Sequence, residues 1–171
     1  TQEDILELVE DLWIKLLKEI YPEKRIQQTP WPKMGYQETM EKYNSDKPDL
    51  REDKNNPDEL AFLWVLDFPA FEYRETESRW DAVHHPFTMP QVSDPGEIKK
   101  DPGKILAYQY DLILNGFEIA GGSIRIHRPD LLQAVFELLG HTKEQIYVKF
   151  GHLLEAFSFG APPHGGIACG L

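Results

Sequence analysis

Cysteine is almost absent from this sequence of 171 residues. Its one cysteine, Cys169, cannot form a disulfide within the chain, and no residues near it have the spacing of a zinc site. We interpret Cys169 as a small buried apolar residue, because no base is placed to activate its thiol. So little cysteine is typical of a reducing compartment, and we expect the protein to be cytoplasmic.

Long apolar runs and an excess of basic charge are also missing. No run approaches the roughly 18 apolar residues of a membrane span, and the first residues are acidic and amphipathic, unlike a signal peptide. The 18 basic residues are outnumbered by 29 acidic ones, the net charge is −11, and no basic stripe is visible. These absences argue against a membrane and against nucleic acid as a main partner of this segment.

Apolar residues make up 41% of the chain, which is enough to form a core. Between residues 1 and 20 they recur every three or four positions and predict a helix with one apolar stripe: Ile5, Leu8, Val9, Leu12, Leu16 and Ile20. Further predicted elements are a short helix at 37–43, a strand at 61–68, hairpins at 71–83 and 105–126, helices at 129–139 and 142–157, and a strand from 166. Residues 26–36 and 90–104 are expected to be loops, and 44–59 a polar linker. Strands with helices gathered at the ends favour an α+β fold.

The hairpin at 105–126 carries two acidic residues whose geometry follows from its turn. With Asn115-Gly116 as the turn, Ile113 faces Glu118 and Asp111 faces Ala120. Asp111 and Glu118 then share one face as diagonal neighbours, roughly 7–8 Å apart at the backbone. Two carboxylates at that distance can share a magnesium ion, or they can be ordinary acids on a solvated face.

Arg125 follows on the same strand. Simple alternation turns it away from Glu118, but a bulge at Gly121-Gly122 reverses the parity and brings Ser123 and Arg125 to the face of the acids. A guanidinium there suits bidentate recognition of a carboxylate or phosphate. The alternative is a salt bridge between Arg125 and one of the two acids.

Two further segments are candidates for binding. His84-His85 can place at most one imidazole in a site, because adjacent strand residues point to opposite faces; it would contact an anion or a metal, or the pair is simply packed or exposed. The glycine-rich segment 160–171 would let a flat ligand lie against its backbone, or it is a strand packed tightly into the core.

Taken together, four motifs resemble one family over nearly the whole chain: FLWVLDFPAFE (62–72), AVHHPFT (82–88), YDLILNGFEIAGGSIRIH (110–127) and GAPPHGGIACGL (160–171). They resemble class II aspartyl-tRNA synthetases of the bacterial type, whose motif 3 begins like GGIACGL. The stretch 34–51 resembles the part that precedes the bacterial insertion domain. The resemblance implies an antiparallel class II sheet flanked by helices, ATP with Mg²⁺, L-aspartate as substrate, and aspartate–tRNA ligase activity.

The resemblance also implies roles for individual residues. Asp111 and Glu118 match the acidic pair that holds ATP-bound magnesium, and Arg125 matches the arginine that binds the aspartate side chain. His84 matches the histidine of the loop that closes over aspartate. The strand that lines the substrate site is matched by Gly121, Gly122 and Ser123. The strand beneath adenine is matched by Gly166, Gly170 and Leu171.

Departures from the family pattern limit what we expect. Motifs 1 and 2 are not in residues 1–171, so we expect part of a catalytic domain that is inactive alone, with most tRNA contacts and the homodimer interface outside this segment. A few residues at 51–56 stand where the insertion domain would sit. Ala120 replaces the usual first of three glycines, which we expect to tighten the pocket. The alternative function is a non-catalytic, synthetase-like binding module.

Overall fold

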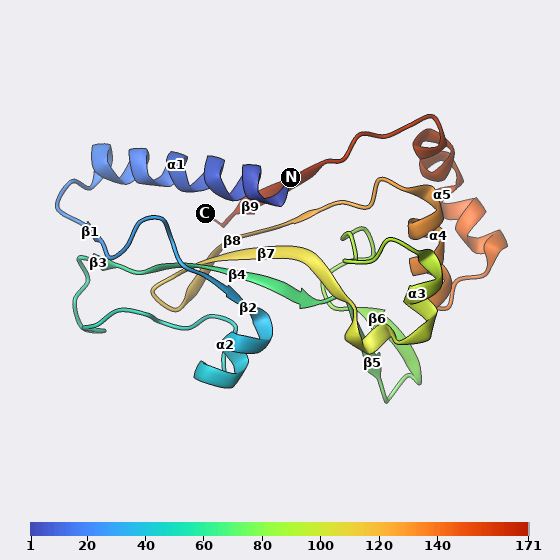
Figure 1. The fold of residues 1–171 in the computed structure, drawn as a ribbon, viewed down its shortest axis with the longest axis horizontal. Helices are drawn as coiled ribbons and strands as arrows, with labels where there is room; N and C mark the ends of the chain where they lie inside the picture. The colour runs from blue at the N-terminus through green and yellow to red at the C-terminus, as the bar shows by residue number, and fades with distance from the viewer. Residues whose placement is uncertain (171) are drawn as a thin grey trace. The chain divides into compact units, whose positions relative to one another are not determined.

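The computed structural model describes residues 1–170. Its helices are α1 (Gln2–Ile20), α2 (Tyr36–Tyr43), α3 (Pro95–Lys100), α4 (Pro129–Leu138) and α5 (Lys143–Ser158), with a 3₁₀ turn at Pro102–Lys104. Its strands are β1 (Arg25–Ile26), β2 (Lys33–Gly35), β3 (Glu59–Leu60), β4 (Phe62–Pro69), β5 (Phe71–Arg74), β6 (Arg79–Ala82), β7 (Leu106–Leu114), β8 (Phe117–Ile124) and β9 (Gly165–Cys169) (Figure 1). The chain divides into two compact units, one made of residues 1–68, 109–123 and those from 165, the other of 69–108 and 124–164.

The first unit is built on a sheet with the strand order β2-β4-β7-β8-β9. Strand β4 is an inner strand of this sheet. Its Leu63, Trp64 and Val65 are fully buried, as the continuous apolar run predicts for a strand covered on both faces. Strands β7 and β8 are antiparallel, but β2 runs parallel to β4. The fold is therefore α+β as expected, with a mixed sheet rather than a wholly antiparallel one.

Helix α1 begins where the sequence predicts, with Thr1 and Asp4 forming a capping box. Its buried side chains are Leu6, Val9 and Leu17, whereas the predicted stripe is largely exposed, at 69% for Leu8 and 58% for Leu12. The predicted face was wrong because apolar residues cover more than half of this helix, and periodicity alone does not decide which part meets the sheet. Figure 1 shows α1 running beside β9.

Segments predicted to be loops or linkers contain short ordered elements. Strand β1 pairs with β3, and β2 pairs with β4, through two- and three-residue ladders that are too short to show a sequence period. In the polar stretch 44–59, the Arg51 guanidinium donates to both oxygens of Asp49, and its Nη1 donates to the Asn56 carbonyl at 3.1 Å. Side-chain hydrogen bonds therefore order a stretch that has no periodic pattern.

The second unit has a core in which α3, α4 and α5 pack together around aromatic rings. Phe136 stacks on Phe150 with ring centroids 4.3 Å apart, and Phe87 meets both rings edge-on. Helix α3 lies in the predicted connection 90–104. Its signal was present, because Asp94 caps the helix, Pro95 opens it and Glu97 completes a capping box.

Candidate functional site

The β7–β8 hairpin turns at Asn115-Gly116, as predicted. Both residues have positive φ, 52° and 87°, which a two-residue hairpin turn of this kind requires. The Asn115 side chain also accepts a hydrogen bond from the Ala61 amide and donates one to the Glu59 carbonyl, both at 2.9 Å. The turn is thereby fixed to the residues just before β4, and the residues along the hairpin are held in register.

The register changes after two residue pairs. Ile113 faces Glu118 as predicted, but a bulge leaves Ile119 unpaired, so that Asp111 faces Gly121 and not Ala120. The expected bulge at Gly121-Gly122 is therefore wrong in position, although its consequence for Ser123 stands: Ser123 pairs with Gln109 on the side of the acids. The repeated small residues indicated a bulge without fixing which residue is extra.

Asp111 and Glu118 converge above Gly121. A Cβ atom built on Gly121 would lie 3.0 Å from Asp111 Oδ1 and 3.1 Å from Glu118 Oε1. Only a residue without a side chain leaves that space free, and it is bordered by two carboxylate oxygens from different positions of the hairpin. The two acids thus border a small oxygen-lined cradle on this face of the hairpin.

The two carboxylates differ in environment. Asp111 is 4% exposed, and burial, reinforced by the charge of Glu118, raises its pKa to about 6, although Gln109 Nε2 donates to Asp111 Oδ1 at 2.9 Å and so favours the ionised form. Glu118 is more exposed and pairs with Lys47, whose Nζ lies 2.8 Å from Glu118 Oε2. Sequence reasoning missed Lys47, which lies in the polar stretch after α2 and has no fixed spacing to the hairpin.

The donor atoms of the cradle are of the kind that binds a magnesium ion. Carboxylate oxygens are the ligands that Mg²⁺ prefers, and the ion is commonly held by one or two of them together with phosphate oxygens and water. Among residues 1–170 no group of three or more His, Cys, Asp or Glu side chains could hold a metal. Asp111 and Glu118 would therefore hold the ion only in part, with the remaining ligands supplied by a substrate.

Strand β9 approaches β8 closely beside this cradle. A Cβ on Gly122 would lie 2.2 Å from the Gly166 carbonyl oxygen, so that only glycine permits the approach. Tyr110 Oη donates to the same carbonyl at 2.9 Å, and the Gly170 amide donates to Ile119 at 2.9 Å. The backbone of Gly166 adjoins open space, as a surface for a flat ligand requires. Leu171, predicted to lie beneath adenine, falls outside the described residues.

The burial expected of β9 and the position expected of Ala120 are both wrong. Strand β9 is exposed along most of its length rather than packed into the core, and Cys169 on it is exposed rather than buried. Ala120 pairs with Leu112 and lies on the face opposite Asp111 and Gly121, whereas the predicted register placed it opposite Asp111 on the same face. The extra residue Ile119 explains this error, because it moves Ala120 to the other face.

In the second unit, Arg125 lies beside His85. Arg125 bridges antiparallel to Thr88, and its Nη1 contacts the His85 ring at both nitrogens, at 3.1 Å from Nδ1 and closer to Nε2. Burial, together with the charge of Arg125, lowers the pKa of His85, so that the ring is neutral and can accept from the guanidinium. The sequence prediction chose His84, which is exposed, whereas the half-buried His85 is the residue beside Arg125. The alternative prediction for Arg125 was a salt bridge to Asp111 or Glu118. The contacts that the structure gives are Arg125 with His85, and Glu118 with Lys47.

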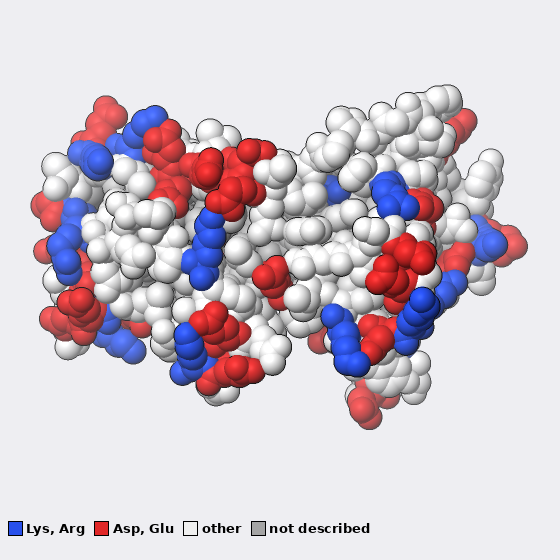
Figure 2. All heavy atoms as spheres, in the orientation of Figure 1, with Lys and Arg blue, Asp and Glu red and all other residues white. Residues whose placement is uncertain are grey.

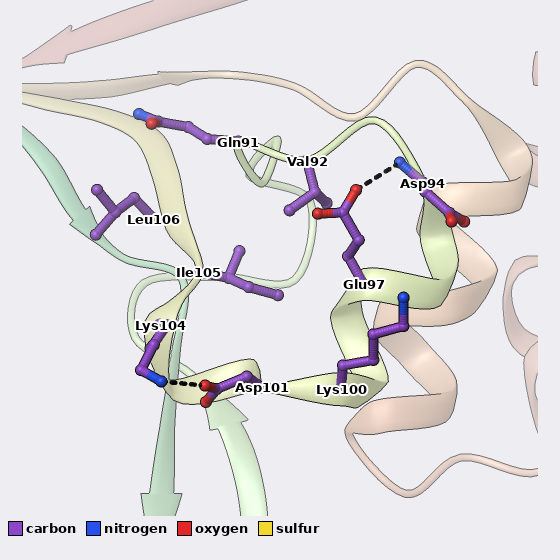
Figure 3. A pocket seen from close by; sticks show the side chains of 9 residues that line it. All are labelled: Gln91, Val92, Asp94, Glu97, Lys100, Asp101, Lys104, Ile105 and Leu106. Carbon is purple, nitrogen blue, oxygen red and sulfur yellow. Dashed lines mark hydrogen bonds and ion pairs between the residues drawn. The ribbon is translucent and has the colours of Figure 1, made fainter.

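A separate hollow of about 580 Å³ in the second unit contains none of the predicted site residues. Figure 3 shows its lining, where Lys104 pairs with Asp101 at 2.6 Å and Glu97 accepts from the Asp94 amide. On the face drawn in Figure 2, acidic and basic side chains are interspersed, and the basic ones form no continuous stripe. Within residues 1–170 no helix is long and apolar enough to cross a membrane.

A family model for tRNA synthetases class II (D, K and N) matches residues 1–171. The chain belongs to this family. It is 58% identical over 119 residues to an aspartate–tRNA(Asp/Asn) ligase of Dehalococcoides mccartyi, and 55% identical over 116 residues to an aspartate–tRNA ligase of Ruminiclostridium cellulolyticum. These matches cover 70% and 68% of this chain but only 19% and 20% of the relatives, so the chain spans about a fifth of their length.

Solved structures of synthetases share the fold of this class II chain. An aspartyl-tRNA synthetase of Entamoeba histolytica superposes with a TM-score of 0.63 at 21% identity, covering 99% of this chain and 36% of that one. An asparaginyl-tRNA synthetase of the same organism, in complex with asparaginyl-adenylate, gives a TM-score of 0.59 at 20% identity, covering 99% of this chain and 39% of that one. The class II fold predicted from the sequence is confirmed.

Proposed function

We propose that the chain supplies the magnesium-binding and aspartate-binding strands of an aspartate–tRNA ligase. The observation that carries the proposal is the convergence of Asp111 and Glu118 above Gly121 in a class II chain. More than half of the aligned residues are identical to those of proteins named as aspartate–tRNA ligases, which supports aspartate over the other amino acids of the family.

The proposed reaction has two steps. An oxygen of the aspartate α-carboxylate attacks the α-phosphorus of ATP and displaces pyrophosphate, giving aspartyl-adenylate. The terminal ribose hydroxyl of tRNA then attacks the acyl carbon and releases AMP. Magnesium, when bound, neutralises charge on the triphosphate.

The residues of this chain would mainly bind and orient the substrates. Asp111 and Glu118 would hold the metal, and Arg125 would bind the side-chain carboxylate of aspartate with its guanidinium fork. His84 and His85 would lie in the segment that covers the amino acid, and Gly166 and Gly170 would lie under adenine with Leu171. Ser123 would line the aspartate-binding site.

Several wider properties belong to the same proposal. We expect a cytoplasmic enzyme whose complete form is a homodimer and whose contacts to tRNA lie mostly outside residues 1–171, because this segment carries a net charge of −11. Residues 51–56, closed by the hydrogen bond from Arg51 to Asn56, would take the place of the bacterial insertion domain.

The test is binding of stable analogues of the aminoacyl-adenylates to the 171-residue chain, measured by calorimetry. We expect the aspartyl sulfamoyl adenosine to bind more tightly than its asparaginyl and lysyl counterparts. Equal or absent binding of all three would favour the non-catalytic module. We also expect no aspartate-dependent exchange of pyrophosphate into ATP by this chain alone, and robust exchange would contradict that expectation.

A further inference from the structure

The Glu118 carboxylate faces two ways. Its Oε2 accepts from the Lys47 ammonium at 2.8 Å, while its Oε1 borders the space above Gly121 together with Asp111 Oδ1. A single positive charge therefore already compensates the carboxylate pair.

The ion pair between Lys47 and Glu118 can be replaced readily by another cation. The Lys47 and Glu118 side chains are 43% and 36% exposed, and ion pairs with such access to water are weak. The segment that carries Lys47 also lies against the hairpin turn, because a Cβ on Gly116 would lie 3.3 Å from Asp49 Cβ and 3.8 Å from the Lys47 carbonyl oxygen. Lys47 can leave Glu118 by rotating its side chain, without movement of the backbone.

We propose that Lys47 is an exchangeable internal counter-ion, and that its ion pair with Glu118 and a divalent cation on Asp111 and Glu118 exclude each other. The inference rests on the proposed function in one respect, namely that this carboxylate pair takes a divalent cation. A cation of charge +2 on Glu118 repels an ammonium on the same carboxylate, and the carboxylate that turns toward the metal loses its geometry for Lys47. Metal binding and release of Lys47 are then one event.

The first test is a titration of the 171-residue chain with Mn²⁺ alone, in which free Mn²⁺ is measured by electron paramagnetic resonance. The Lys47→Met variant removes the competitor, and we expect it to bind Mn²⁺ about three- to tenfold more tightly. Lys42→Met is the matched control, because Lys42 pairs with Glu38 on α2 and its loss changes the net charge equally. In a Glu118→Gln background, Lys47→Met should give no gain.

The second test uses the unaltered chain and does not depend on the stability of a variant. Acetylation of each lysine is quantified by mass spectrometry with and without Mn²⁺. We expect Lys47 to react several-fold faster when Mn²⁺ is bound, because its ammonium no longer contacts Glu118, whereas Lys42 should not change.

The outcomes separate this inference from the proposed function. Unchanged or weaker Mn²⁺ binding by Lys47→Met, or acetylation of Lys47 that is insensitive to Mn²⁺, would overturn the exchange while leaving the carboxylate site intact. Mn²⁺ binding by Glu118→Gln equal to that of the unaltered chain would overturn both the exchange and the assignment of the metal to this pair. Binding of the aspartyl-adenylate analogue reports on the aspartate site independently of either result.

Discussion

The two predicted binding clusters are opposite in charge and are built differently. Asp111 and Glu118 belong to one hairpin, and the space between them is defined by Gly121 of the same hairpin. Arg125 and His85 are 40 residues apart, and a loop brings the imidazole to the guanidinium. A site built within one hairpin follows from its register, whereas a site built from a strand end and a loop depends on packing that no local pattern describes.

The largest expected effect concerns the cationic cluster. Arg125→Lys keeps the charge but removes the fork, so that a bidentate contact to the aspartate carboxylate is lost together with its fixed geometry. Since a charge-assisted hydrogen bond contributes about 1.5–3 kcal/mol, affinity for the aspartyl-adenylate analogue should fall about 10- to 100-fold. Calorimetry measures this, with Arg128→Lys as control, because Arg128 pairs with Asp130 at the surface. Equal losses in both variants would show that Arg125 has no special role.

The next effect concerns the stability of the anionic cluster and its dependence on pH. Asp111 has a raised pKa of about 6 against an ordinary value of 3.8, so the folded state holds its proton more tightly than the unfolded chain does. The contribution of Asp111 to the free energy of unfolding therefore falls as the pH rises from about 4 to 6, and it stays low at higher pH. Asp111→Asn removes the penalty and should raise the free energy of unfolding at pH 7.5 by up to about 3 kcal/mol, with little gain near pH 3.5.

Urea unfolding at several pH values checks this, and Asp49→Asn supplies a control of opposite sign. Its neighbour Arg51 lowers the pKa of Asp49, so that replacement of Asp49 should destabilise the chain at pH 7.5 and have less effect in acid. A gain from Asp111→Asn that does not vary with pH would mean that Asp111 ionises normally. Mn²⁺ at pH 7.5 should stabilise the unaltered chain but not Asp111→Asn.

The same difference explains how far the sequence predicted the molecule. The type of fold, the hairpin turn, the start of α1 and the two acids were predictable, because each depends on residues close in sequence. The bulge at Ile119 was misplaced, since any of several neighbouring residues can be the extra one. Lys47 was missed, and the contact of His85 with Arg125 was not predicted, because both depend on where a loop lies against a strand.

A smaller effect distinguishes Ala120 from Gly121, two neighbouring small residues of β8. Gly121→Ala places a Cβ about 3 Å from an oxygen of each acid, which must shift by a few tenths of an ångström, and we expect Mn²⁺ affinity to fall about tenfold. Ala120→Gly should leave Mn²⁺ affinity unchanged, because Ala120 faces the other side, and should cost about 1 kcal/mol of stability. If Ala120→Gly changes the affinity more than Gly121→Ala does, the observed register is wrong.

The smallest effect distinguishes the two histidines. His85→Asn removes the ring that accepts from Arg125 and should weaken binding of the aspartyl-adenylate analogue about threefold. His84→Asn should weaken it less, because His85 is the residue that contacts the Arg125 guanidinium. The folded pKa of His85 lies below the ordinary 6.5, so the folded chain binds fewer protons than the unfolded one. The contribution of His85 to stability is then complete above pH 6.5 and falls as the pH drops below it, because burial and the charge of Arg125 both disfavour protonated His85. Unfolding measured between pH 5 and 7 should show this fall in the unaltered chain and in His84→Asn, and a smaller one in His85→Asn. The same slope in all three proteins would assign the fall to another group and leave His85 without a role in holding Arg125.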